Sequence, residues 1–228
     1  MSPKEPQQSS LPIVLAITGA SGAVYAARTL QWLLLAKRQI HLVVSPDGAT
    51  VVRQELGFDA EFALANIEQF LLTADSFLSE GPPTKSDQWV HLRESLAAGW
   101  LQVHHPSDYF APIASGSYRT AAMVVCPCSG STLSSIAHAS GRNLIHRAAE
   151  VHMKERRKLV LVPRETPLST LQIDNMLRLS SAGAVILPAS PGWYHGVKQM
   201  RDLVDFVASR ILDQLDVAHQ HIRRWGDA

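Results

Sequence analysis

The stretch "LPIVLAITGASG" (residues 11–22) decides the fold of this chain. It opens with an almost unbroken apolar run, which is typical of a β-strand covered on both faces. A small glycine-containing turn follows, and residues 23–37 then have the composition of a helix. A buried strand that passes through a tight turn into a helix is the first half of a unit in which helices connect parallel strands. The start of the chain therefore predicts an α/β protein.

The same alternation continues toward the other end of the chain. We predict a mostly helical segment at 58–78, strands at 40–45, 121–129, 158–163 and 184–191, and helices at 46–57, 143–157, 169–183 and 197–215. Ser169 and Gln172 have the spacing of a capping box. Since parallel strands need crossover connections, this order predicts a doubly wound parallel sheet with helices on both faces, a three-layer arrangement.

Length and pattern favour a single domain. A chain of 228 residues with 46% hydrophobic residues can bury one substantial core, which we expect to span 11–228. Residues 1–10 are polar and are predicted to be a disordered tail. The segment 79–120 is the least patterned part of the chain, and its beginning, 79–88, is predicted to be a loop.

Composition excludes several classes of function. Lysine and arginine number 21 against 20 acidic residues, whereas proteins that bind duplex nucleic acid usually have a marked basic excess. The two cysteines, Cys126 and Cys128, are too close in sequence to join distant segments, which favours a reduced, intracellular protein. Residues 1–10 lack the apolar core of a signal peptide, and no apolar run reaches the length of about 20 residues that spans a membrane. We expect a cytoplasmic protein that binds neither nucleic acid nor membrane.

Hydroxyls, glycines and a few charges follow the predicted strands. In a doubly wound sheet, ligands bind beyond the carboxyl ends of the strands. Small residues at helix starts let backbone donors approach a phosphate, so these segments predict a cradle for a phosphorylated ligand. The segments are "TGASG" (18–22), Ser45, "CPCSGST" (126–132), "PRETP" (163–167) and "PASPGWYHG" (188–196).

Each segment carries little weight alone. The spacing of "GASG" fits neither the nicotinamide motif nor the P-loop motif, and such a turn is more often structural than functional. "CPC" lacks the partner residues of a zinc site, so buried small residues are the better interpretation. The basic run "KERRK" (154–158) is either a solvated helix end or a contact across a subunit boundary. "PRETP" differs, because two prolines fix the backbone around Arg164 and Glu165 and thereby favour a positioned pair.

Several motifs taken together closely resemble the UbiX-like flavin prenyltransferases, a family formerly labelled aromatic-acid decarboxylases. The resemblance runs in order from about residue 11 to 226 and is very specific. It rests on "TGASGAVYAARTL", "APIASGS", "CPCSGSTLSSIA", "NLIHRAAEVHMKERRKLVLVPRETPLS", "NMLRLSSAGAVILPASPGWYH" and "DLVDFVASRILDQL".

The resemblance implies a flavodoxin-like Rossmann fold, assembled as a homododecamer with sites at subunit interfaces. It implies binding of reduced FMN and dimethylallyl monophosphate, and transfer of the prenyl group to the flavin without a metal. The product, prenylated FMN, would pass to a UbiD-type decarboxylase.

The same resemblance assigns roles to individual positions. Glu165 matches the acid that protonates the departing phosphate, and Glu55, Lys154 and Tyr109 match further catalytic positions. Residues that match contacts to the prenyl phosphate are Ser21, Lys154, Arg164, Tyr194 and Arg210. Residues that match contacts to FMN are Gly19, Ala20, Ser21, Ser45, Ser115, Ser129, Gly130, Ser131, Thr132, Arg147 and Arg164.

The chain also departs from the family pattern. Tyr109 falls at or near the position of a frequent tryptophan, and 73–100 matches poorly, so no role is inferred for that stretch. Two other functions stay open: a decarboxylase of the wider flavoprotein family that acts on a cysteine-containing substrate, and a flavin-storing relative without catalysis. Lys154, Glu165 and Arg210 argue against storage, because a storage protein needs no cage for a second phosphate.

Overall fold

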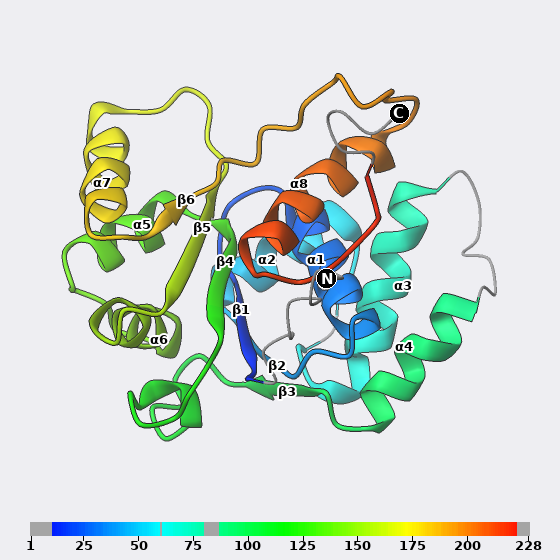
Figure 1. Cartoon of the computed structure of the whole chain (residues 1–228), viewed down its shortest axis with the longest axis horizontal. Helices are drawn as coiled ribbons and strands as arrows, with labels where there is room; N and C mark the ends of the chain where they lie inside the picture. Colours follow the sequence, from blue (N-terminus) through cyan, green and yellow to red (C-terminus); the bar gives the residue numbers. More distant parts are fainter. Residues whose placement is uncertain (1–10, 60, 80–86, 223–228) are drawn as a thin grey trace, which may run out of the picture.

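Six parallel strands form one sheet in the order β3-β2-β1-β4-β5-β6 (Figure 1). The computed structural model of the chain describes residues 11–59, 61–79 and 87–222, and the predicted tail at 1–10 lies outside this part. Winding reverses at β1, which lies between β2 and β4, so the predicted doubly wound fold class is confirmed. The strands are β1 (Ile13–Ile17), β2 (Ile40–Val44), β3 (Leu101–His104), β4 (Ala122–Cys128), β5 (Lys158–Pro163) and β6 (Val185–Ile186).

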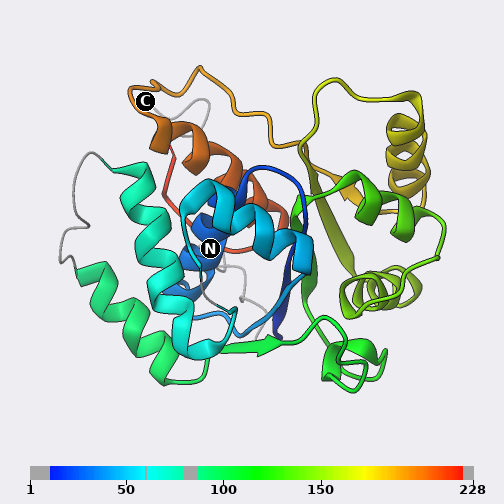
Figure 2. The ribbon, with the colours of Figure 1, turned by 180° about the vertical axis from the view of Figure 1, so that it is seen from behind.

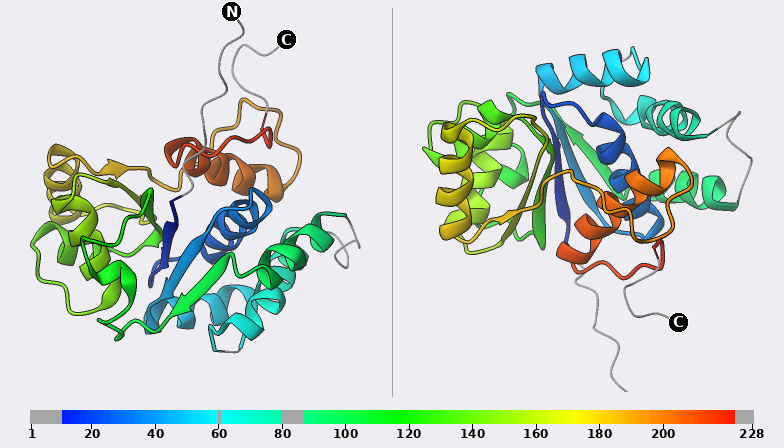
Figure 3. Two further views of the ribbon diagram at one scale, coloured as in Figure 1. Left: turned by 60° about the horizontal axis from the view of Figure 1, so that its bottom comes forward. Right: turned by 90° about the horizontal axis from the view of Figure 1, so that it is seen from above.

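Helices cover both faces of the sheet, as the edge-on view in Figure 3 shows. Alternate side chains of β1 enter different cores: Ile13, Leu15 and Ile17 join one apolar cluster, and Val14 and Ala16 join the other. Every residue of β1 is therefore buried, which explains its unbroken apolar sequence. The first cluster includes residues of α1 (Ala23–Leu35), α2 (Pro46–Leu56), α3 (Ile67–Leu78), α4 (Asp87–Ala97) and α8 (Met200–Gln214), and the second includes residues of α5 (Gly130–Ala137), α6 (Leu144–Lys154) and α7 (Thr170–Ser181).

The weakly patterned segment contains two elements that the sequence did not predict, α4 and β3. The prediction of a loop over 79–88 was wrong at its end, because α4 begins at Asp87. Trp89 and Leu92 are buried against the first cluster, but polar residues surround them in the sequence. β3 has only four residues and lies at the edge of the sheet, where Gln102 is exposed, so it lacks the apolar run of the central strands.

Capping residues set the other helix ends. The predicted capping box is present at the start of α7, where the Ser169 hydroxyl accepts from the Gln172 amide N–H. α8 begins at Met200 rather than at 197, because Gln199 and Asp202 form a second capping box there. Within the strand predicted at 184–191, β6 is the regular part, and the Leu187 and Ala189 amides still donate to the β5 carbonyls of Leu161 and Pro163. Residues 190–199 then cross to α8 (Figure 2).

Two glycines allow the turns beyond the central strands to meet. A Cβ atom on Gly48, in the first turn of α2, would lie 2.6 Å from the Ile17 carbonyl oxygen. A Cβ on Gly19 would lie 2.6 Å from the Asp47 Cβ. Both distances are shorter than a real side chain tolerates. The turn after β1 and the start of α2 therefore touch, as a shared site at this edge requires.

Candidate active site

The turns after β1 and β4 are joined at the point where the winding of the sheet reverses. Thr18 closes β1, and its hydroxyl donates to the Pro127 carbonyl at 2.8 Å and accepts from the Ser129 amide at 2.9 Å. The sequence placed Thr18 in the predicted rim only as part of "TGASG", although a polar residue that ends an apolar run could have indicated this link. These bonds hold the "GASG" turn beside "CSGST", at the place where doubly wound proteins bind ligands.

Glu55 lies at the start of α1. Its carboxylate accepts from the Gly22 amide at 2.9 Å and from the Ala23 amide at 2.8 Å. A negative charge is favourable there because the N-terminus of a helix carries unpaired N–H groups and a partial positive charge. A ligand phosphate at the start of α1 would compete with the Glu55 carboxylate for the same backbone N–H groups. Other helix starts on the rim are therefore better candidates for holding it.

Arg164 completes a cluster with Ser21 and Glu55. The Arg164 Nε donates to the Ser21 carbonyl at 3.3 Å. Tyr25 lies in the same group: burial raises the pKa of its hydroxyl, and the charges of Arg164 and Glu55 also act on it. The structure thus brings together residues that the resemblance placed at the prenyl phosphate, and it adds Tyr25, which the sequence analysis missed.

The side chains of Arg164 and Glu165 diverge after β5. While Arg164 turns toward Ser21, Glu165 stays exposed and its Oε1 accepts from the Thr166 amide at 3.2 Å. Both border a cavity of about 120 Å³, which Met176 and Ala189 also line. The two residues thus share a small pocket between α7 and the residues after β6, and Arg164 in addition reaches the β1 turn.

Two of the serines predicted at FMN, Ser45 and Ser129, act as helix caps. The Ser45 hydroxyl accepts from the Gly48 amide at 3.0 Å and caps α2. The Ser129 hydroxyl accepts from the Thr132 amide at 3.2 Å, caps α5 and lies 3.1 Å from the Ser131 hydroxyl. Gly130 lies against α7, since a Cβ there would come within 2.8 Å of the Gln172 side chain. The starts of α2 and α5 therefore face this rim with small residues around them.

Lys154, Ser115 and Arg147 lie apart from this cluster. Lys154 ends α6, four residues before β5 begins, and Arg164 follows the end of β5. At about 3.3 Å per residue, β5 separates its two ends by about 17 Å. Lys154 packs on Gly116, next to Ser115, and the Arg147 Nε donates to the Ala114 carbonyl at 3.0 Å. These three predicted residues thus form a second group, near the amino ends of the strands.

Three more predicted residues lie on other parts of the surface. Tyr194 is 61% exposed and packs edge-on against Phe206, at the N-terminal half of α8. Arg210 is exposed further along α8 and pairs with Asp213 at 2.7 Å. Tyr109 is 48% exposed in the connection between β3 and β4. All three side chains are therefore accessible to a ligand or to another copy of the chain.

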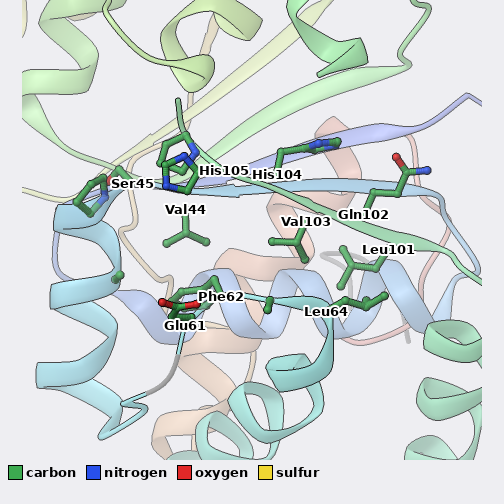
Figure 4. Close-up of a pocket in the computed structure, with 14 residues that line it drawn as sticks. Val44, Ser45, Glu61, Phe62, Leu64, Leu101, Gln102, Val103, His104 and His105 are labelled. Carbon is green, nitrogen blue, oxygen red and sulfur yellow. The ribbon is translucent and has the colours of Figure 1, made fainter. Parts of the chain in front are cut away.

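A larger cavity of about 760 Å³ lies beyond Ser45, along β3 (Figure 4). His104 and His105 line it, with Phe62 and Leu64 opposite. Behind it, His41 Nδ1 is 2.7 Å from His104 Nε2.

Cys126 and Cys128 are both buried, and burial raises the pKa of each thiol. Within the described ranges, no three His, Cys, Asp or Glu side chains are grouped as a metal site requires.

Buried histidines make folding sensitive to acid. Burial lowers the pKa values of His41, His152 and His221 to about 4 each. An unfolded histidine titrates near pH 6.5, so below that pH the unfolded chain binds protons that the folded chain does not. We expect the free energy of unfolding to be constant above about pH 7. From about pH 6.5 to 4 it should fall, by at most about 1.4 kcal/mol per pH unit for each histidine.

Urea unfolding at several pH values between 7 and 4.5 measures this slope. His152→Gln should reduce it, whereas the same change at His138, which is exposed, should leave it as in the parent. An unfolding free energy that stays constant from pH 7 to 5 would contradict the prediction.

The fold and this rim define a class: a doubly wound α/β protein that binds a phosphorylated ligand where the winding reverses. The Flavoprotein family model matches residues 1–212. The flavin prenyltransferase UbiX of Pseudomonas aeruginosa is 44% identical over 215 residues, which are 94% of this chain and 94% of that protein. The chain therefore belongs to the Flavoprotein family and, within it, to the UbiX-type flavin prenyltransferases, a group of transferases.

Two solved structures agree with this assignment. AnUbiX in complex with FMN and dimethylallyl pyrophosphate superimposes with a TM-score of 0.76 at 32% identity, over 96% of this chain and all of the other. A dodecameric, FMN-dependent UbiX-like decarboxylase from Escherichia coli O157:H7 gives 0.74 at 34% identity, over 95% and 100%. The resemblance inferred from the sequence is confirmed. In the part of the chain that the structure describes, no helix combines the length and apolarity that a membrane span needs.

Proposed function

We propose that this protein transfers a dimethylallyl group from dimethylallyl monophosphate to reduced FMN, without a metal, and supplies prenylated FMN to a UbiD-type decarboxylase. The observation that carries the proposal is the cluster of Ser21, Glu55 and Arg164 at the point where the sheet winding reverses. A flavin and a phosphate ester are the ligands that the related AnUbiX structure holds.

FMN fits the rim as an acceptor substrate. Its phosphate needs backbone donors at a helix start, and the capped starts of α2 and α5 offer them beside Ser45 and Ser129. Gly19 and Gly130 leave no room for a side chain because Asp47 and Gln172 fill that space, so both turns pack closely on the neighbouring helices at this rim. The Glu55 carboxylate already accepts from the N–H groups at the start of α1. We therefore assign Glu55 to proton transfer next to Ser21, and not the start of α1 to binding of the FMN phosphate.

Cations and an acid suit the bond that must break. Phosphate leaves the allylic carbon with the electron pair of the carbon–oxygen bond, while the central-ring nitrogen of the flavin forms the new bond to carbon. Arg164, with Lys154 and Arg210, would neutralise the departing charge, and Tyr194 would add a hydroxyl donor. Glu165 would give the phosphate its proton. The flavin nitrogen loses its proton in this step. In a second step the prenyl double bond takes up a proton, its tertiary carbon bonds to the adjacent benzenoid carbon, and that carbon loses its proton, which closes the fourth ring of the product.

We further infer that each site is shared among copies of the chain in a homododecamer. Lys154 precedes the amino end of β5 and Arg164 follows its carboxyl end. The two ends of β5 lie about 17 Å apart, which is further than a lysine and an arginine of one chain can span to meet at one phosphate. Arg210 is exposed on α8. A second and a third copy can bring these cations to Arg164, and the E. coli relative is dodecameric.

Anaerobic incubation with reduced FMN and dimethylallyl monophosphate tests the activity. Mass spectrometry of the released flavin should show the gain of one five-carbon unit, in buffer with EDTA as well as without it. A parallel reaction with dimethylallyl pyrophosphate in place of the monophosphate shows which of the two substrates the protein prefers. Recovery of unmodified FMN alone, while a UbiX relative converts it under the same conditions, would refute the proposed function.

A further inference from the structure

Arg157 clamps the backbone of the "ASGSY" loop (114–118). It lies in the turn between α6 and β5, where Arg156 adopts a φ of 54° and the Arg157 amide donates to the His152 carbonyl. Its guanidinium Nη1 donates to the Tyr118 carbonyl at 2.7 Å, and Nη2 donates to the Gly116 carbonyl at 2.5 Å. The planar fork of an arginine suits two acceptors held side by side, whereas a lysine offers one point charge.

The clamped loop lies against Lys154, which we assigned to a neighbouring subunit's site. The Ser115 and Ser117 hydroxyls are 2.9 Å apart and both residues are exposed. Between them, Gly116 provides the surface on which Lys154 packs: a Cβ there would lie 2.6 Å from the lysine Nζ. Two hydroxyls, the Lys154 ammonium group and the Glu155 carboxylate paired with it thus gather around one glycine. A phosphate that binds this ammonium group would replace Glu155 as its partner.

Lys154 is otherwise weakly held. Its side chain is half exposed, and its ion-pair partner is the adjacent Glu155. Fixing a lysine side chain in one position costs much conformational entropy. A rigid Gly116 backbone reduces this cost, because the surface under the ammonium group is already in place before the ligand binds. Arg157 bonds to the carbonyl on each side of Ser117 and can therefore provide that rigidity.

We propose that Arg157 is a positioning residue, which orders the Gly116 backbone so that Lys154 meets the prenyl phosphate bound by a neighbouring subunit. The inference rests on the proposed function and deepens it, because it identifies what prepares the lysine. Arg157 need not touch the substrate, since both of its strong bonds go to loop carbonyls. Its effect on the reaction passes through Lys154.

A double-mutant cycle on the full-length protein tests this route. Arg157→Gln should lower kcat/KM for dimethylallyl monophosphate roughly 10- to 100-fold, as displacement of a binding group by about 1 Å does. In the Lys154→Met background, the same change should have less than about a twofold effect, because the group that it positions is gone. Arg157→Lys should restore only part of the activity, since one ammonium group cannot bridge both carbonyls.

Arg156→Gln is the matched control, because it removes the same charge from the adjacent exposed position. It should stay within about twofold of the parent protein. Circular dichroism and light scattering verify that each variant keeps its fold and assembly. If Arg157→Gln does not fold, addition of guanidinium ions to Arg157→Ala should raise kcat/KM, and absence of this rescue overturns the proposal.

The proposal would also be overturned if Arg157→Gln lowered kcat/KM by the same factor in the parent protein and in the Lys154→Met variant. Arg157 would then have a purely structural role. Failure of the proposed function gives a different result, because the parent protein itself would then form no prenylated FMN. The two failures can therefore be told apart in one series of reactions.

Discussion

Lys154→Ala and Arg164→Ala should each form prenylated FMN at least about 100-fold more slowly than the parent, because each loses a cation that stabilises the departing phosphate. When the two variants are expressed together, activity should return to about one quarter of the parent level if the copies mix at random in a symmetric assembly. Half of the sites would receive an intact Arg164, and half of those an intact Lys154. The physical basis is the length of β5, which keeps the two cations of one chain apart.

Two affinity tags, one on each variant, allow the mixed assemblies to be purified before flavin mass analysis. The matched control combines Arg164→Ala with Glu165→Gln. These residues are adjacent in one chain, so every site would inherit one of the two defects and no activity should return. Absence of recovery in the Lys154 and Arg164 mixture, with mixing proved by the tags, would contradict the shared site.

Glu165→Gln should slow prenyl transfer by about 10²- to 10⁴-fold while FMN still binds, because an amide keeps the shape of the side chain but supplies no proton. The decrease should appear in kcat rather than in KM, since the lost interaction serves the breaking bond. Single-turnover prenylation and flavin fluorescence titration measure the two quantities separately.

Glu94→Gln on α4 makes the same chemical change far from the rim and should leave both quantities as in the parent. Full activity of Glu165→Gln would show that the proton comes from elsewhere. Glu55, which accepts two backbone N–H bonds beside Ser21, would then be the next acid to test.

How much could be predicted from the sequence differs among the elements. The central strands were predicted because burial on both faces requires apolar residues at every position, as in "IVLAI". The edge strand β3 and helix α4 were missed, because an edge strand is buried on fewer sides and α4 presents few apolar residues to the core. Short elements of this kind depend on tertiary contacts, which local sequence does not encode.

For the site, the sequence alone determined the chemistry, and the tertiary structure decided its distribution. The segments "GASG", "CSGST" and "PRETP" each end a strand, so their order along the chain was enough to predict a rim of hydroxyls around an arginine and an acid. The predicted helix at 143–157 and strand at 158–163 already put Lys154 and Arg164 at opposite ends of one strand. Only the fold placed Glu55 on the start of α1 and Lys154 beside Gly116, because these contacts join segments far apart in the sequence. A strand is rigid and has a fixed rise per residue, so residues at its two ends cannot meet within one chain.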